Sequence, residues 1–241
     1  INYQPGLALA LKNTGYCYYL KGKYKDAVIH WQQALEVYKL IGDKTGVANM
    51  LSNQGAVYFA QGDDAKALEL HLQSLKMAEE LNDSLRITTS LTNIGGVYQN
   101  KKATYEKALE YFIRAYKMSL AINDKHEIGT AAVNLGEFYF KINNDSTALK
   151  YLNESVNAYK GTEDLPYALN YVGRVYTRQG EFERAVQTHT EAFEIAKKLD
   201  ARLDMVQSLV GLGQAYYAKE DISQAINAYK QSLEYGTPMK A

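Results

Sequence analysis

The sequence predicts an all-α protein built as a helical solenoid, and two observations carry this prediction. Small residues recur at a nearly constant spacing, and no stretch alternates between polar and apolar residues as a strand does. The recurring residues are glycines whose steps are 40, 40, 41, 37 and 40 residues: Gly15, Gly55, Gly95, Gly136, Gly173 and Gly213. A fixed period of about 20 to 50 residues is typical of stacked helical repeats.

Each repeat divides into two expected helices, as the second copy illustrates. Small and apolar residues from Val47 to Tyr58 fall at steps of three and four, which places them on one helix face. A second such face runs from Ala67 to Ala78. Gly62 lies between them, where a left-handed residue should end the first helix. Asp63 or Asp64 can then cap the second helix.

The same pair of helices is expected in every copy. The first helices should begin near Gly6, Lys44, Ser84, Lys125, Leu165 and Arg202, and the second helices near Tyr24, Asp64, Tyr105, Asp145, Phe182 and Ile222. Asp43, Asp83 and Asp124 stand where N-caps would stand. We therefore expect one continuous domain over residues 1–241, with repeats at about 5–42, 43–82, 83–123, 124–162, 163–200 and 201–236.

Two further columns suggest how the helices pack. A tyrosine follows each anchoring glycine by three residues, and an alanine follows it by twelve, or by thirteen in the third copy. We expect glycine and alanine to let two helix backbones approach closely, with tyrosine filling the wider gap beside them. A larger residue at these positions would then overpack the contact, at about 1–3 kcal/mol. Since one hairpin cannot bury both its apolar sides, stability must come from neighbouring hairpins.

Three copies depart from the pattern. The third copy carries an extra residue within 101–106 and lacks the turn glycine, and the fourth replaces that glycine with Asn143, which tolerates the left-handed region. The link into the fifth copy is three residues shorter, with Pro166 in the first turn of the next helix, where proline is tolerated. We expect a local change of superhelical twist at that link.

The order of glycine, tyrosine, alanine and a further small residue resembles the tetratricopeptide repeat over residues 5–236. The resemblance implies a right-handed superhelical solenoid of six antiparallel helix hairpins whose concave groove binds a peptide or protein segment. The usual period of that family is about 34 residues. The longer period here is similar to repeats of spindle-orientation adaptors, bacterial peptide-pheromone regulators and the sensory parts of bacterial signalling proteins.

The resemblance places one column of this sequence in the groove. Two residues before each glycine the sequence has Asn13, Asn53, Asn93 and Asn134, followed by Tyr171 and Gly211 in the last two copies. An amide offers two donors and an acceptor, which match the C=O and N–H groups of an extended peptide. The alternative, which stays open, is that these asparagines bond within their own helix layer.

A second column, four residues after each glycine, contains Tyr19, Phe59, Gln99 and Phe140 before Thr177 and Tyr217. These side chains either supply apolar contacts in the groove or pack on the following repeat, and both readings stay open. The expected partner-binding residues are Asn13, Asn53, Asn93, Asn134, Tyr16, Tyr19, Phe59, Gln99, Phe140, Arg174 and Arg178.

Charged residues add little to the expected groove. The basic clamp of chaperone-binding family members would fall at Lys12, Thr89 and Asn93, of which only the first is basic, so an acidic chaperone tail is not expected. Arg174 and Arg178 lie one helical turn apart and share a face, near Lys141. Glu137 stands four residues before Lys141 and in the column of Arg174, which favours mutual neutralisation of this basic spot.

Composition excludes several other classes of function. Lys plus Arg and Asp plus Glu both total 27, so no long-range field attracts nucleic acid. The single cysteine, Cys17, forms no internal disulfide, and His71 and His189 share a packing column two repeats or more apart, which favours a structural role over metal binding. No metal and no cofactor is expected. No apolar run is long enough to insert into a membrane.

We therefore expect a non-enzymatic interaction module, the sensory or scaffolding part of a larger signalling protein, because no nucleophile–base pair, paired carboxylates or metal set is present. The alternative is a peptide-pheromone-responsive regulator whose superhelical pitch changes on binding. The sequence begins at Ile1, so a longer protein is expected. The expected compartment is the cytoplasm, or the periplasm if a leader and a membrane anchor lie outside this stretch.

Overall fold

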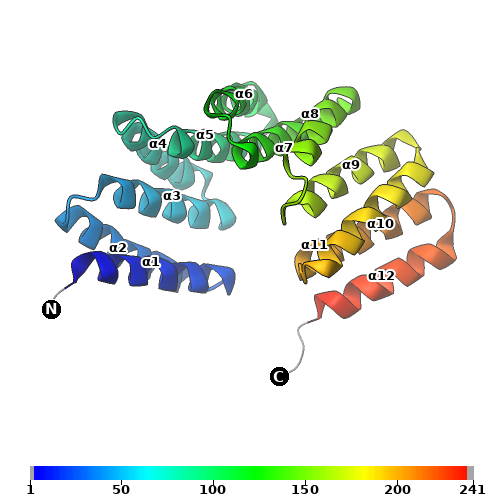
Figure 1. Cartoon of the computed structure of the whole chain (residues 1–241), viewed down its shortest axis with the longest axis horizontal. Coiled ribbons are helices and arrows are strands. Elements are labelled where there is room, and N and C mark those ends of the chain that lie inside the picture. The colour runs from blue at the N-terminus through cyan, green and yellow to red at the C-terminus, as the bar shows by residue number, and fades with distance from the viewer. Residues whose placement is uncertain (1–2, 238–241) are drawn as a thin grey trace. The chain divides into compact units, whose positions relative to one another are not determined.

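The computed structural model describes residues 3–237, and within them it contains twelve α-helices, one short 3-10 helix and no strand. The two helices of each repeat pack against each other as an antiparallel hairpin (Figure 1). The prediction of an all-α protein made of six helix hairpins is confirmed. None of the described helices combines the length and apolar character that crossing a membrane requires.

The chain separates into two compact units, residues 1–122 and 123–241, each with three hairpins. The helices of unit one are α1 (Gln4–Leu20), α2 (Tyr24–Leu40), α3 (Lys44–Ala60), α4 (Asp64–Glu80), α5 (Ser84–Tyr98), η1 (Lys102–Thr104) and α6 (Tyr105–Ile122). Those of unit two are α7 (Lys125–Lys141), α8 (Asp145–Ala158), α9 (Leu165–Gln179), α10 (Phe182–Lys198), α11 (Arg202–Ala218) and α12 (Ile222–Gly236). All second helices start where expected, and α1 starts two residues earlier than Gly6.

The helix ends follow the expected capping chemistry. Asp43 Oδ1 accepts a hydrogen bond from the backbone N–H of Gly46 at 2.8 Å, which satisfies one of the donors left free at a helix start. Asp83 and Asp124 do the same for α5 and α7 at 3.1 and 3.0 Å. Between helices, Gly62 has φ of 80° and Asn143 has φ of 61°, so both adopt the left-handed conformation predicted for them.

The extra residue of the third copy forms η1 between α5 and α6. In place of a turn glycine, the hydroxyl of Thr104 donates to the backbone oxygens of Tyr98 and Lys101. The side chain therefore satisfies carbonyls at the end of α5, which explains how this hairpin closes without a left-handed residue at the usual position.

The anchoring glycines have a different partner from the one expected. The atom nearest to each belongs to a large side chain from the second helix of its own hairpin. A Cβ atom added to any of these glycines would come within 2.5–2.7 Å of that side chain. The pairs are Gly15–Trp31, Gly55–His71, Gly95–Phe112, Gly136–Leu152, Gly173–His189 and Gly213–Tyr229. The glycine therefore makes room for a ring or a leucine, and at Gly136 the backbone N of Leu152 would also lie 3.3 Å from the added Cβ.

Each unit has its own apolar core along these contacts. The alanine column is fully buried in every hairpin, as Ala27, Ala108 and Ala185 illustrate with no exposed surface. Trp31 and Phe112 are among the largest fully buried side chains of unit one. At the glycine contacts the second helix contributes the bulky side chain, while elsewhere in the cores the first helices also bury large side chains such as Met50 and Phe138.

Candidate binding surface

Several first helices of neighbouring hairpins contact one another within their unit. In unit one α3 contacts α5, and in unit two α9 contacts both α7 and α11. Their faces that turn away from the second helices form a surface, which we call the first-helix surface of that unit. Every residue expected to bind a partner lies on a first helix or, for Gln99, at its C-cap.

The asparagines of unit one differ in their surroundings. Asn13 is exposed and Asn53 is half-buried, and neither forms a side-chain hydrogen bond within the described residues. Asn93 is half-buried and donates through Nδ2 to the hydroxyl of Ser52 at 3.2 Å, which links α5 to α3. Its amide is therefore partly used within its own layer, while the amides of the other two retain all their hydrogen-bonding groups.

The asparagine of unit two bonds to its own helix. Asn134 donates through Nδ2 to the backbone oxygen of Thr130 at 2.7 Å, one turn earlier in α7. One donor and the side-chain oxygen of Asn134 remain for other partners. In the next two hairpins the same column has Tyr171, which is half-buried, and Gly211, which has no side chain to offer. Binding of a partner by the asparagines stays a prediction.

The aromatic side chains of unit one divide between core and surface. Tyr19 packs on Trp31 and Tyr24 with ring centroids 5.8 and 5.7 Å apart, and burial raises the pKa of its hydroxyl. By contrast, Tyr16 and Phe59 expose 54% and 37% of their surface. The last two therefore offer apolar area to a partner, whereas Tyr19 mainly completes the first hairpin.

Arg178 in unit two is held by contacts within the protein. Its guanidinium forms an ion pair with Asp145 and donates to Asn143 Oδ1 and the backbone oxygen of Phe140 at 2.9 and 2.8 Å. It also stacks over the Phe140 ring, 3.7 Å from the centroid. These bonds tie α9 to the turn between α7 and α8. The side chain thus has a structural role, and Phe140 is partly covered by it.

Arg174, one turn earlier, is held only by rings. Its guanidinium lies 5.0 Å from the centroid of Phe140 and 4.7 Å from that of Tyr171. Within the described residues it forms no hydrogen bond and no ion pair. Stacking on aromatic faces fixes an arginine while leaving its N–H groups free to bind another partner.

Glu137 and Arg174 form no direct ion pair. The hydroxyl of Tyr167 donates to Glu137 Oε1 instead, and the nearby hydroxyl of Tyr171 also stabilises the charged carboxylate. Burial raises the pKa of Glu137, and these bonds and the charge of Arg174 oppose the shift. The charges of Glu137 and Arg174 therefore act on each other without a direct ion pair: the hydroxyl of Tyr167 donates to the carboxylate, and the guanidinium has no hydrogen bond within the described residues.

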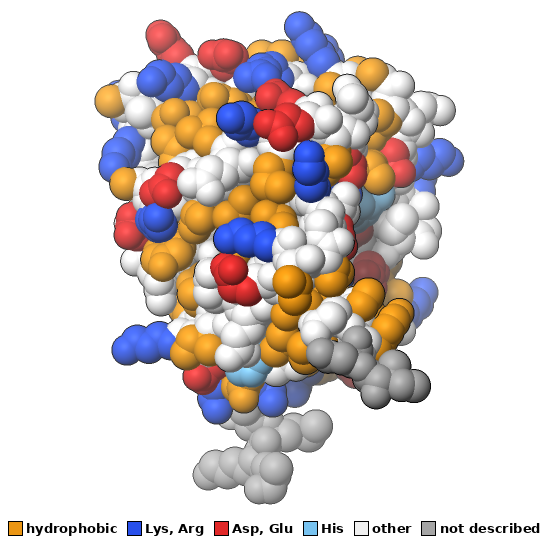
Figure 2. Space-filling view, turned by 90° about the vertical axis from the view of Figure 1, so that its left-hand side faces the viewer, with side chains coloured by type: hydrophobic (Ala, Val, Ile, Leu, Met, Phe, Trp, Pro, Cys, Tyr) orange, Lys and Arg blue, Asp and Glu red, His pale blue; other side chains and the backbone are white. Residues whose placement is uncertain are grey.

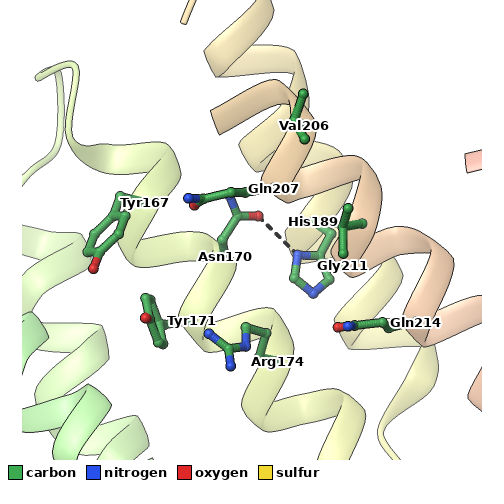
Figure 3. A pocket seen from close by; sticks show the side chains of 10 residues that line it. Tyr167, Asn170, Tyr171, Arg174, His189, Val206, Gln207, Gly211 and Gln214 are labelled. Carbon is green, nitrogen blue, oxygen red and sulfur yellow. Dashed lines mark hydrogen bonds between the residues drawn. The ribbon is translucent and has the colours of Figure 1, made fainter. Parts of the chain in front are cut away.

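A cavity of about 400 Å³ opens on the first-helix surface of unit two, between α9, α10 and α11 (Figure 3). Its lining residues are Tyr167, Asn170, Tyr171, Arg174, His189, Val206, Gln207, Val210, Gly211 and Gln214. Of these, the sequence pattern had singled out only Arg174 as a binding residue. The signals that could have located the cavity are Gly211 in the asparagine column and His189 in the column of large side chains.

Two buried polar side chains form the floor of this cavity. His189 Nδ1 and Asn170 Oδ1 lie 3.0 Å apart, and the two residues expose only 1% and 4% of their surface. Burial and the charge of Arg174 lower the pKa of His189 to about 4, so its ring is neutral at pH 7. Since Asn170 Oδ1 can only accept, Nδ1 carries the ring proton. Asn170 Nδ2 and His189 Nε2 have no hydrogen-bond partner in the part of the chain that the structure describes.

Charge on the protein surface is mixed rather than segregated. On the face drawn in Figure 2, basic and acidic side chains are interspersed with hydrophobic ones. This agrees with a formal net charge of zero. The described residues also contain no group of three or more His, Cys, Asp or Glu side chains placed to hold a metal ion.

The sequence and fold were compared with known proteins. The family model described as tetratricopeptide repeat matches residues 6–80, 86–161 and 164–235. Among curated proteins, no sequence matches the chain. Among solved structures, the chain is similar to BtubC from P. vanneervenii, with 17% identity, a TM-score of 0.70, and coverage of 99% of this chain and 93% of that one.

Two further solved structures are similar at comparable levels. The Rap conjugation gene regulator of the plasmid pLS20, in complex with a peptide, has 16% identity and a TM-score of 0.71, with coverage of 96% of this chain and 76% of that one. A signal-transduction ATPase with a tetratricopeptide repeat sensor, from Pyrococcus horikoshii, has 17% identity and a TM-score of 0.71, with coverage of 94% and 36%. At these identities the likeness shows a shared fold.

Proposed function

Because the chain belongs to the tetratricopeptide repeat family, we propose that it is a non-enzymatic interaction module that binds a peptide or a protein segment on its first-helix surface. The observation that supports this most is the set of polar groups left unused on that surface. Among residues 3–237, Asn13 and Asn53 in unit one form no side-chain hydrogen bonds, and Arg174 in unit two forms no ion pair. Such groups match the backbone and side chains of an extended segment.

Apolar area next to these groups fits the same proposal. Tyr16 and Phe59 are exposed on the first helices of unit one, near the asparagine column in sequence. Aromatic side chains that are exposed beside polar groups are favoured at protein interfaces, because one residue supplies both large contact area and few rotamers to order. The bound segment would contact the asparagines through its backbone and these rings through its side chains.

A second proposal is that the chain is the sensory part of a regulator and changes the arrangement of its hairpins when a peptide binds. The similar Rap regulator was solved with a peptide, and the similar ATPase carries its repeats as a sensor. Small-angle scattering with and without a bound peptide would test this. A lower radius of gyration on binding is expected, and an unchanged scattering curve would contradict the regulator proposal only.

Peptide selection provides the test of the interaction module. A library of displayed peptides would be selected on the protein, and the affinity of a synthetic winner measured by fluorescence anisotropy. Asn53→Ala and Arg174→Ala should weaken binding about tenfold if the peptide uses their units, since each removes a polar contact to the peptide. Gln73→Ala, on the exposed face of α4, is the matched control and should bind normally.

The proposal would be contradicted if the selected peptides bound Asn53→Ala and Arg174→Ala with the same affinity as the unaltered protein. So would a peptide whose affinity falls only with substitutions on the second helices. Circular dichroism of each variant checks that its helical content is unchanged, which separates loss of binding from loss of the fold.

A further inference from the structure

One wall of the cavity in unit two is a residue of α11 that has no side chain. Gly211 occupies the column in which the first four copies place asparagine. A Cβ atom there would lie 2.3 Å from the ring of His189. Gly173 presses on the same ring from α9, with its own added Cβ at 2.6 Å from Nε2. The imidazole therefore occupies the space that side chains at these two positions would fill, and it forms part of the cavity floor.

The open groups of this cavity are mainly hydrogen-bond donors. Asn170 Nδ2 is buried and without a partner, although an unpaired buried donor costs about 1–3 kcal/mol. Figure 3 shows Asn170 and Arg174 on the same side of α9, facing the cavity from one helix turn apart. Arg174 adds guanidinium N–H groups that no described residue uses. The acceptors are fewer: His189 Nε2, which is held against Gly173, and the side-chain oxygens of Gln207 and Gln214.

The acidic group that could satisfy these donors from inside the protein is occupied. Glu137 receives a hydrogen bond from the hydroxyl of Tyr167, and it forms no ion pair with Arg174. The Tyr167 hydroxyl is therefore used by this carboxylate and does not offer its proton to the cavity. A basic ligand would meet the unpaired charge of Arg174 at the mouth.

We propose that this cavity receives one acidic side chain, aspartate or glutamate, of the segment bound on the first-helix surface. The carboxylate accepts hydrogen bonds from the guanidinium of Arg174 and from Asn170 Nδ2. A planar guanidinium held by two rings matches a carboxylate because both oxygens can bond at once. This inference rests on the proposed interaction function and adds the chemistry of one position in the partner.

Blocked tripeptides test this selectivity on the full chain. The probes are acetyl-Ala-Glu-Ala-amide, its glutamine and lysine counterparts, and the alanine tripeptide, titrated while backbone amide signals are followed by NMR. Amide signals of Arg174, Gln207 and Gly211 should shift with the glutamate peptide. The glutamine peptide should bind on the order of tenfold more weakly, because it replaces a charge-assisted hydrogen bond by a neutral one. The lysine peptide should not shift these signals.

Two substitutions and a control assign the effect to the cavity. Arg174→Gln should remove the preference for glutamate over glutamine. Gln214→Glu places a carboxylate of the protein on the cavity lining, at an exposed position. It should weaken binding of the glutamate peptide without disturbing the core. Arg184→Ala is the matched control, because Arg184 also lies over a tyrosine ring, 4.0 Å from the centroid of Tyr176, but does not line the cavity. It should leave binding unchanged.

Equal binding of the glutamate and glutamine peptides would overturn the inference, as would an unchanged preference in Arg174→Gln or the absence of shifts around the cavity at millimolar peptide. None of these results would contradict the proposed interaction function. A selected peptide that binds through the asparagine column while ignoring the cavity would leave the interaction module standing and remove only the acidic position.

Discussion

Two adjacent glycines of α5 should respond in opposite ways to the same substitution. Gly95 faces Phe112, whose ring carbons Cδ1 and Cε1 would both lie 2.7 Å from an added Cβ. Gly96, the next residue, would meet no atom within 4 Å. Since both are interior helix positions with ordinary backbone angles, only the space beside them differs.

The expected free-energy changes follow from this geometry. In Gly95→Ala the ring must move by several tenths of an ångström, and Phe112 is only 1% exposed, so its surroundings cannot yield. Overpacking costs about 1–3 kcal/mol, and the better helix propensity of alanine offsets about 0.5–1 kcal/mol of that. Gly95→Ala should therefore lower the free energy of unfolding by about 1–2 kcal/mol. Gly96→Ala should raise it by about 0.5–1 kcal/mol.

Urea unfolding followed by circular dichroism measures both variants under the same conditions. The two substitutions add the same methyl group to neighbouring residues, so each controls for the chemistry of the other. If Gly95→Ala is as stable as Gly96→Ala, the anchoring glycines do not serve to receive the large side chains of the second helices. The packing account of all six hairpins would then be wrong.

Three other substitutions test individual contacts. Burial lowers the pKa of His71 to about 4, below the value of about 6.5 in an unfolded chain, so the unfolded state binds more protons and stability falls as pH drops from 6.5 toward 4. His71→Phe introduces the residue that the next repeat has at this position, Phe112. Between pH 7 and pH 5 the free energy of unfolding of the variant should fall by about 2 kcal/mol less than that of the unaltered protein. An equal fall in both proteins, measured by urea unfolding, would contradict this. Tyr167→Phe removes one hydrogen bond from the half-buried carboxylate of Glu137. It should cost about 1–2 kcal/mol at pH 8 and progressively less as falling pH protonates Glu137; a pH-independent cost would argue against the contact. Arg178→Ala should lower the free energy of unfolding by about 1 kcal/mol and speed amide hydrogen exchange at the α7–α8 turn. An unchanged exchange rate there would show that this arginine does not stabilise the turn.

Much of the fold could be predicted because local chemistry repeats six times. The aspartate N-caps, the left-handed Gly62 and Asn143, and every second-helix start were predicted from single positions whose backbone preferences are strong. The partner of the anchoring glycine was not. A column of glycines indicates a close contact, but the contacting atom comes from another helix, and the sequence does not say whether it belongs to a backbone or a ring.

The candidate site was less predictable for the same reason. Arg174 and Arg178 look alike in sequence, one turn apart on one face, yet the structure ties Arg178 to Asp145 and leaves Arg174 unpaired. Glu137 was expected to meet Arg174 because they share a column. Instead, the hydroxyl of Tyr167 in α9 donates to this carboxylate. Side-chain geometry between neighbouring helices decides which of several possible partners a charged group contacts. The periodicity of the sequence contains no information on that geometry.

Hydrogen–deuterium exchange of the protein with a selected peptide tests the central claim most directly, because it reports which helices the peptide covers. Slower exchange is predicted in α1, α3 and α5, or in α7, α9 and α11, at residues of the first-helix surface. Protection confined to the second helices of the hairpins would contradict binding on that surface.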